Sequence, residues 1–175
     1  MLGAIIGDIV GSRFEWNNIK TKEFELLNHK CRFTDDSAMT LAVASALLKC
    51  NGNYNKLENF VISEMQKIGN KYPNAGYGGH FRHWLVDDDP KPYGSYGNGS
   101  AMRVSPCGFV ANSLEEAKVL SKIVTGVSHN HPEGYKGAEA TAVAIYLARS
   151  GKSIIEIRDY INDNYYPMNF KLDDI

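Results

Sequence analysis

Three consecutive residues, Thr34, Asp35 and Asp36, place a hydroxyl and two carboxylates in one short segment. Three hard oxygens of this kind suit Mg²⁺ or a similar divalent cation. The same residues also suit an ordinary helix start, because a threonine hydroxyl accepts from free amides and carboxylates favour the positive helix end. On this segment alone capping is favoured over metal binding, since acidic first turns are common, and both interpretations stay open.

A second candidate is the loop from Tyr93 to Gly99, which contains three glycines among small hydroxyl and amide side chains. The backbone of such a loop can press closely against a ligand. The segment lacks the lysine of a Walker loop and the preceding strand of a dinucleotide-binding motif. Taken alone, it therefore indicates a ligand contact with low specificity.

His129 and His131 form a third candidate. Their spacing would suit zinc, but no other soft ligands lie nearby in the sequence. Pro132 at a helix start is a sufficient local reason for the turn. One histidine that contacts a polar ligand is the more economical interpretation.

The elements that must position these residues are helical by their hydrophobic pattern. Apolar side chains recur at helical spacing from about Asp35 to Cys50, and one buried stripe follows from that spacing. No stretch alternates with period two for long, and no strand–helix–strand rhythm is present, so we expect an all-α fold. The other expected helical segments are 54–68, 80–86, 114–127, 137–148 and 154–161.

Residues 2–10 are small and apolar, and Gly3, Gly7 and Gly11 lie four apart on one helical face. Each glycine weakens a helix by about 1 kcal/mol relative to alanine, so we expect a compensating close contact with another backbone. Asp8 is the lone charge in this segment. It is expected to cap or orient a neighbouring group rather than to take a direct part in chemistry.

Composition limits the class of protein. The 175 residues predict one domain, 1–175, and a chain of this length buries about 70% of its unfolded surface. The net charge of -1 and the lack of a basic run favour a small-molecule or protein partner and indicate neither nucleic acid nor membrane. Three scattered cysteines and the absence of a signal-peptide pattern predict reduced thiols in the cytoplasm.

Four motifs, in order along nearly the whole chain, resemble those of the ADP-ribosylglycohydrolase family, which includes the dinitrogenase reductase-activating glycohydrolase. Four motifs in register are much more specific than any one of them. They are Gly7-Asp8-Ile9-Val10-Gly11 with Glu15, Phe33-Thr34-Asp35-Asp36-Ser37-Ala38-Met39, Tyr96-Gly97-Asn98-Gly99-Ser100-Ala101-Met102-Arg103-Val104-Ser105-Pro106, and Ser128-His129-Asn130-His131-Pro132-Glu133-Gly134.

The resemblance implies an all-α, orthogonally packed bundle with a pair of Mg²⁺ or Mn²⁺ ions in a central cleft. It implies that Thr34, Asp35 and Asp36 ligate the first ion, and that Glu15 lies on a mobile loop that covers the substrate. Glu15, Asp35 and Asp36 are the implied catalytic residues. The substrate-binding residues implied in the same way are Tyr96, Gly97, Asn98, Gly99, Ser100 and His129.

The implied reaction is hydrolysis of the glycosidic bond that joins ADP-ribose to an arginine or serine side chain, or to another ADP-ribose unit. Two cations can orient the ribose hydroxyls and lower the pKa of a water. Fold membership alone does not fix the reaction, because some relatives use other nucleotide-sugars or have lost activity.

The chain departs from the family near residues 172–175, where Asp173 and Asp174 lack a following hydroxyl. The family carries a glycine-rich Asp-x-Asp-Thr or Asp-x-Asp-Ser segment near its carboxyl end, which supplies the second metal half. This chain has nothing like it, and residues 172–175 resemble the interior of a full-length member. We therefore expect a truncated hydrolase with at most a partial metal site, impaired or inactive alone, that self-associates or binds a complementing carboxyl-terminal fragment. The alternative is a non-catalytic ADP-ribose-binding or structural module.

Overall fold

The computed structural model describes residues 1–169, and within that range the chain is helical and contains no strand. This confirms the all-α class. Two short 3₁₀ turns, η1 (Tyr54–Lys56) and η2 (Ala101–Arg103), accompany the α-helices. The α-helices are α1 (Leu2–Gly11), α2 (Asp35–Cys50), α3 (Leu57–Lys71), α4 (Gly79–Val86), α5 (Ser105–Val110), α6 (Leu114–Gly126), α7 (Pro132–Arg149) and α8 (Ile154–Asn164).

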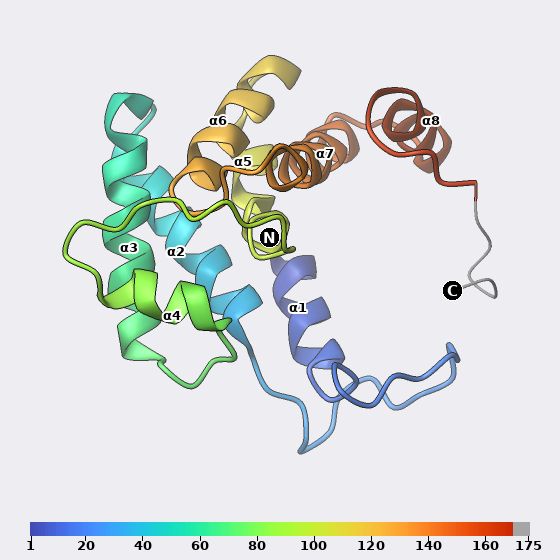
Figure 1. Ribbon diagram of the computed structural model, residues 1–175. Coiled ribbons are helices and arrows are strands. Elements are labelled where there is room, and N and C mark those ends of the chain that lie inside the picture. Colours follow the sequence, from blue (N-terminus) through green and yellow to red (C-terminus); the bar gives the residue numbers. More distant parts are fainter. Residues whose placement is uncertain (170–175) are drawn as a thin grey trace.

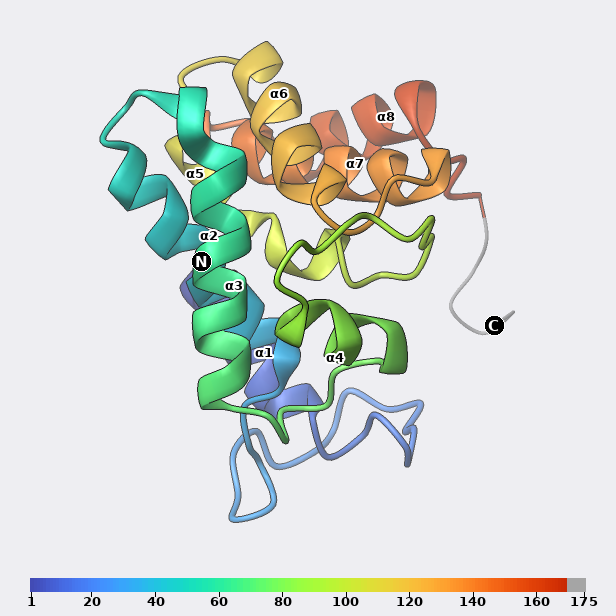
Figure 2. The ribbon, with the colours of Figure 1, turned by 60° about the vertical axis from the view of Figure 1, so that its left-hand side comes forward.

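Helix α2 is central to the arrangement. It packs against α3 along its length and also contacts α1, α5 and η2 (Figure 1). Helix α7 is seen nearly end-on in Figure 1, whereas α3 runs from the top to the bottom of the view, so the two helices cross at a large angle. In the view turned by 60°, α6, α7 and α8 lie in the upper part of the molecule and α1 and α4 in the lower part (Figure 2). No helix in residues 1–169 is long and apolar enough to cross a membrane.

The predicted buried stripe of α2 is confirmed. Its apolar side chains lie in the main hydrophobic core with the facing residues of α3, α4 and α6. The helix spans the predicted range from Asp35 to Cys50 and ends at Asn51, which adopts the left-handed conformation with φ of 45°. The stripe residues, all 4% exposed or less, are Met39, Ala42, Val43, Ala46 and Leu47.

Other helix boundaries shift for local reasons. Helix α7 begins at Pro132 rather than at residue 137, because the His131 side chain accepts from the Glu133 amide and proline suits a first helical position. The expected 54–68 segment divides into η1 and α3, because Asn53 caps a separate turn through the Asn55 amide. The short helix α5 was not predicted.

Gly108 allows α5 to lie close to α7. A Cβ atom at Gly108 of α5 would lie 2.5 Å from the Ala142 carbonyl oxygen of α7. Only glycine permits this approach, since a side-chain carbon at that distance would overlap the backbone. The contact fixes α5, and with it the preceding η2 turn, against α7.

Asp8 joins α1 to the start of α2. Its carboxylate accepts from the Thr34 amide at 2.8 Å, the Thr34 hydroxyl at 2.5 Å and the Ser37 amide at 3.1 Å. The Ser37 hydroxyl donates to the same carboxylate. The prediction that Asp8 orients a neighbouring group is therefore confirmed, and the group is the first turn of α2.

The expected close contact on the glycine face of α1 is not formed in the described part of the chain, so that prediction was wrong. Cβ atoms built at Gly3, Gly7 and Gly11 have no atom within 4 Å. Leu2 and Ile6 of the same helix are 76% and 52% exposed. Helix α1 packs on α2 through the opposite side. The exposed side of α1, which carries the glycines together with Leu2 and Ile6, remains uncovered, and we call it the open face of α1.

Replacement of Asp8 by alanine is expected to lower the free energy of unfolding by about 2–3 kcal/mol, because two amides and two hydroxyls lose a charged acceptor. Urea denaturation measures the loss. Asp88→Ala, which removes a fully solvent-facing carboxylate, is the control and is expected to change stability by less than about 0.5 kcal/mol. Equal effects of the two substitutions would contradict the role of Asp8.

Candidate functional site

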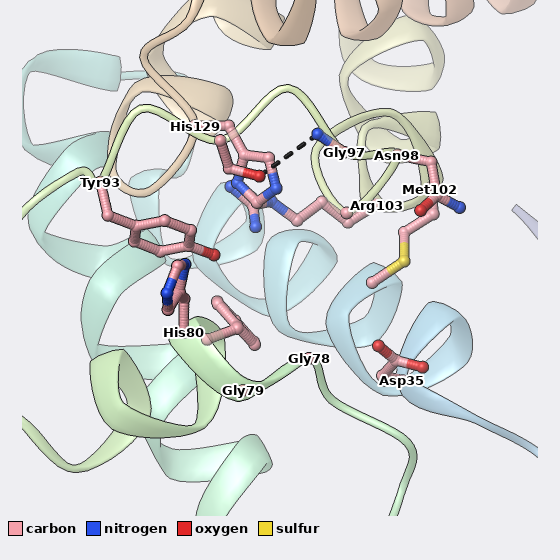
Figure 3. Close-up of a pocket in the computed structure, with 13 residues that line it drawn as sticks. Asp35, Gly78, Gly79, His80, Tyr93, Gly97, Asn98, Met102, Arg103 and His129 are labelled. Atoms are coloured by element: carbon pink, nitrogen blue, oxygen red, sulfur yellow. Dashed lines mark hydrogen bonds between the residues drawn. The ribbon is translucent and has the colours of Figure 1, made fainter.

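A cavity of about 290 Å³ lies between the start of α2, the start of α4 and the loop that precedes η2 (Figure 3). It brings together five of the residues predicted from the sequence, although they are far apart along the chain. These are Asp35, Gly97, Asn98, Gly99 and His129. The other lining residues are Gly78, Gly79, His80, Phe81, Tyr93, Ser95, Met102 and Arg103.

The loop from 93 to 99 is fixed to the turn between α6 and α7. The Tyr93 amide donates to the Ser128 carbonyl oxygen at 3.0 Å, and the Gly94 amide donates to Asn130 Oδ1 at 2.7 Å. Gly94 has a φ of 68°, a conformation that glycine adopts without strain. The loop and the His129 turn therefore form one unit.

His129 lies directly against Gly99 and leaves little room for a side chain there. A Cβ atom at Gly99 would be 3.0 Å from His129 Nε2 and 3.2 Å from Cε1. Within the loop, the Gly97 amide donates to the Ser95 hydroxyl at 3.2 Å, the dashed line in Figure 3. The glycines thus let the loop backbone and the imidazole line one wall of the cavity together.

Two predicted substrate-binding residues lie outside the cavity lining. The Tyr96 side chain is 74% exposed, and its ring centroid lies 5.2 Å from that of His131. Ser100 is buried behind the loop and donates its hydroxyl to the Gly134 carbonyl oxygen at 3.1 Å. Ser100 therefore supports the loop from behind.

Four carboxylates gather at the start of α2, and we call Asp8, Glu15, Asp35 and Asp36 the acidic corner. Burial, followed by the charges of Asp36, Glu15 and Asp8, raises the pKa of Asp35 to about 6. Burial and the charge of Asp8 also raise the pKa of Asp36. Among these residues Asp35 lines the cavity, Asp36 does not, and Glu15 lies on the exposed loop between α1 and α2.

Thr34 caps α2 as the sequence suggested. Its Oγ1 accepts from the Asp36 amide at 3.3 Å and donates to Asp8. A hydroxyl oxygen has two lone pairs, so the cap leaves one for a further contact. Capping and metal binding are therefore compatible at this residue.

The acidic corner provides few ligands for a metal ion. In residues 1–169, no group of three His, Cys, Asp or Glu side chains is arranged to hold a metal ion. Mg²⁺ usually keeps several waters and binds proteins through one or two carboxylates, which Asp35 and Asp36 can supply. Every charge that acts on the pKa of Asp35 is another carboxylate, so a cation would relieve their repulsion. Asp173 and Asp174 lie outside the described residues.

The opposite side of the cavity carries a buried positive charge on Arg103, which is 1% exposed. Burial lowers the pKa of its guanidinium to about 10, which leaves the group charged near neutral pH. Burial and this charge lower the pKa of His129 to about 4, so the imidazole is neutral. The cavity therefore lies between an acidic corner and a buried cation.

Sequence reasoning did not select Arg103, His80 or Tyr93 as functional residues. Arg103 lies inside one of the quoted motifs, and a lone cation beside a glycine loop is a signal that could have identified it. His80 and Tyr93 contact each other with ring centroids 5.6 Å apart, and Tyr93 also lies 5.6 Å from His129. Their proximity depends on packing between α4 and the loop, which no local pattern encodes.

The sequence of this chain is similar to a described protein family and to known proteins. The model of the family described as ADP-ribosylglycohydrolase matches residues 1–173. Similar proteins include those named ADP-ribosylhydrolase ARH3 from Xenopus tropicalis, Gallus gallus and Homo sapiens, at 28%, 28% and 27% identity. The matches cover 87%, 87% and 89% of this chain and 50% of each relative, so the chain spans about half the length of these relatives.

The raised pKa of Asp35 predicts a specific pH dependence of stability. The folded state holds this proton to about pH 6 and the unfolded chain only to about 3.8, so the folded state binds more protons between those values. Stability from this residue therefore falls as pH rises through that window. Asp35→Asn is expected to remove this decline and to be more stable than the wild type near neutral pH in the absence of divalent ions.

Urea denaturation at a series of pH values, with the metal ions removed by chelation, measures this effect. Asp88→Asn, at an exposed position, serves as the control. The same pH profile in Asp35→Asn and the wild type would show that Asp35 is not held in a repulsive environment.

Proposed function

This chain belongs to the ADP-ribosylglycohydrolase family, and we propose that its cavity binds an ADP-ribosyl group for hydrolysis of the bond that links it to a protein side chain. The observation that carries the proposal is the joining, in one cavity, of Asp35 with the Gly97 to Gly99 loop and His129. Acidic groups beside a sugar and backbone amides beside phosphates are the complementary surfaces that such a ligand needs.

The charge distribution supports an orientation of the ligand. The diphosphate would lie against the glycine loop, with the buried guanidinium of Arg103 behind it, since both favour negative charge. The reacting ribose would then lie toward Asp35. A volume of about 290 Å³ is at the lower end for small-molecule sites, so it would enclose part of the nucleotide-sugar.

The acidic corner would serve the reaction through charge and proton transfer. Loss of the leaving group builds positive charge on the ribose, and carboxylates beside the sugar stabilise that charge. In the absence of an ion, Asp35 has a pKa of about 6 and is suited to accept a proton from an attacking water, whereas a bound cation would lower that pKa. Glu15, on the loop between α1 and α2, would approach from the solvent side.

Thr34, Asp35 and Asp36 would hold an Mg²⁺ or Mn²⁺ ion. When bound, that ion would neutralise the acidic corner and orient the ribose hydroxyls. The donor set within residues 1–169 suits one ion, and a second ion would need further ligands. The proposal therefore includes a complementing segment that supplies them.

The open face of α1 supports a site for that complementing segment. Leu2 and Ile6 are exposed on a helix with a single charged residue, and this helix also holds the acidic corner in place through Asp8. The relatives contain about as much chain again as is present here. The occupant we propose is the helical carboxyl-terminal half of the family fold, with a second copy of this chain as its substitute when that half is absent.

Calorimetry with ADP-ribose tests the binding site. We expect binding that strengthens when Mg²⁺ or Mn²⁺ is added, and an Asp36→Asn variant that loses at least about tenfold in metal affinity, because one of two carboxylate ligands is removed. Asp88→Asn is the control, with an affinity equal to that of the wild type.

Incubation with ADP-ribosylated serine or arginine peptides then tests hydrolysis, with and without a carboxyl-terminal fragment from a relative. Released ADP-ribose supports the hydrolase. Binding without release in either mixture would support the alternative of a non-catalytic ADP-ribose-binding module, and failure to bind ADP-ribose would overturn the proposal.

Light scattering tests the open face of α1. The chain alone is expected to form dimers or larger species at high concentration, and Ile6→Lys is expected to shift it toward monomer because a charge in an apolar interface is costly. Ile154→Lys, at an 87% exposed position on α8, is the control for a surface charge. A monomer at all concentrations, with neither variant affecting binding of the carboxyl-terminal fragment, would count against this surface.

A further inference from the structure

We propose that Arg103 and Ser128 are positioning residues that fix His129 in the tautomer with its proton on Nε2, so that a neutral N–H donor faces the cavity. The inference extends the proposed function. The tautomer is argued from the structure itself, whereas the role of the N–H donor in ligand binding rests on the proposed function. It follows from a chain of hydrogen bonds between these three residues. The guanidinium can only donate, and this restriction fixes the direction of the bonds that follow.

The first link in the chain is the guanidinium of Arg103, which can only donate. Its Nη2 lies 2.8 Å from Ser128 Oγ and 2.9 Å from the Val124 carbonyl oxygen. Both Arg103 and Ser128 are 1% exposed or less, so water does not compete for these bonds. Ser128 Oγ must therefore accept a hydrogen bond from the arginine.

The second link is the contact of 2.8 Å between Ser128 Oγ and His129 Nδ1. The serine hydroxyl has one proton, and among the described residues its hydrogen bonds are to Arg103 and His129. The arginine cannot accept that proton, so Nδ1 of the histidine is the acceptor that remains. A buried hydroxyl proton without an acceptor would cost about 1–3 kcal/mol.

The tautomer follows from counting protons. If Nδ1 carried a proton, Arg103 and His129 would both donate to the Ser128 oxygen, and the serine proton would have no acceptor. Nδ1 is therefore unprotonated, and the neutral ring carries its proton on Nε2. Burial and the charge of Arg103 hold the pKa of His129 low, which agrees with a neutral ring.

The protonated nitrogen faces the ligand side. A Cβ atom at Gly99 would lie 3.0 Å from His129 Nε2, so this edge of the ring is against the glycine loop, and His129 lines the cavity (Figure 3). Within residues 1–169, the ring forms its side-chain hydrogen bond through Nδ1. Nε2–H is therefore available to an acceptor oxygen of the ligand, such as a phosphate or ribose oxygen.

Arg103 then has two effects on the same site. Its charge favours an anion in the cavity, and its hydrogen bond to Ser128 sets the direction of the histidine donor. Its Nε is buried with no hydrogen-bond partner in the described part of the chain, so the group is not fully neutralised by its surroundings. A ligand anion would find a positive field and an oriented donor on one wall.

Nitrogen-15 NMR of the imidazole rings in the ligand-free protein tests the tautomer directly. We expect Nδ1 of His129 to have the shift of an unprotonated ring nitrogen and Nε2 that of a protonated one. Assignment uses the signal lost in His129→Gln. His131 serves as an internal reference, because its Nδ1 accepts from the Glu133 amide at 3.1 Å and its neutral form must also carry the proton on Nε2.

The Ser128→Ala variant tests the relay. Removal of the hydroxyl is expected to shift His129 toward a mixture of tautomers and to weaken ADP-ribose binding about tenfold, as one oriented hydrogen bond is lost. Ser121→Ala is the matched control, since Ser121 is equally buried and donates to the Lys118 carbonyl oxygen within α6. The control is expected to leave both the His129 signals and the affinity unchanged.

The outcomes separate the two proposals. A proton on His129 Nδ1 in the wild type would overturn the relay whether or not ADP-ribose binds, and this measurement stands even if Ser128→Ala does not fold. An unchanged tautomer in a folded Ser128→Ala would also overturn it. The expected tautomer without any binding of ADP-ribose would leave the relay intact and remove the proposed function.

Discussion

The contact between the Asp8 carboxylate and the first turn of α2 is the interaction on which the site depends. Two amides and two hydroxyls from Thr34 and Ser37 converge on this one side chain. The donors come from the positive end of α2, where a carboxylate is favourable. The Thr34 hydroxyl also lies 3.3 Å from Asp36 Oδ2, so Asp8 and Asp36 share this donor.

Four carboxylates lie close together in this arrangement, and burial, followed by repulsion from the neighbouring carboxylates, raises the pKa values of Asp35 and Asp36. Repulsion within such a cluster lowers the stability of the fold, and clusters of this kind are common at functional sites. On the other side of the cavity, Arg103 is buried and charged and His129 is neutral. The two sides thus differ in charge in the way that a sugar linked to a diphosphate would need.

The open face of α1 lies on the same helix as Asp8, which holds the start of α2. Helix α1 contacts α2 on one side and leaves Leu2 and Ile6 exposed on the other. Whatever covers that face would also restrain Asp8, and through it the start of α2. One short helix carries both the exposed apolar surface and the carboxylate that holds the start of α2.

The sequence by itself determined the local structure and the identity of the chemical groups. Periodic apolar residues predicted α2 from Asp35 to Cys50, and the order of the four motifs predicted the family that the comparison confirmed. The approximate position of the glycine loop was also readable, because glycine and small polar residues restrict what such a segment can form. These features depend on neighbours along the chain.

Only the tertiary structure decided which groups meet. Several features join segments that are far apart in the sequence. They are the place of His80 and Tyr93 in the cavity, the position of Ser100 behind the loop, and the relay from Arg103 through Ser128 to His129. The glycine face of α1 predicted a close contact that the described residues do not form. Hydrogen-bond direction and burial depend on the packing of whole helices, and a pattern of residue types along one helix does not contain that information.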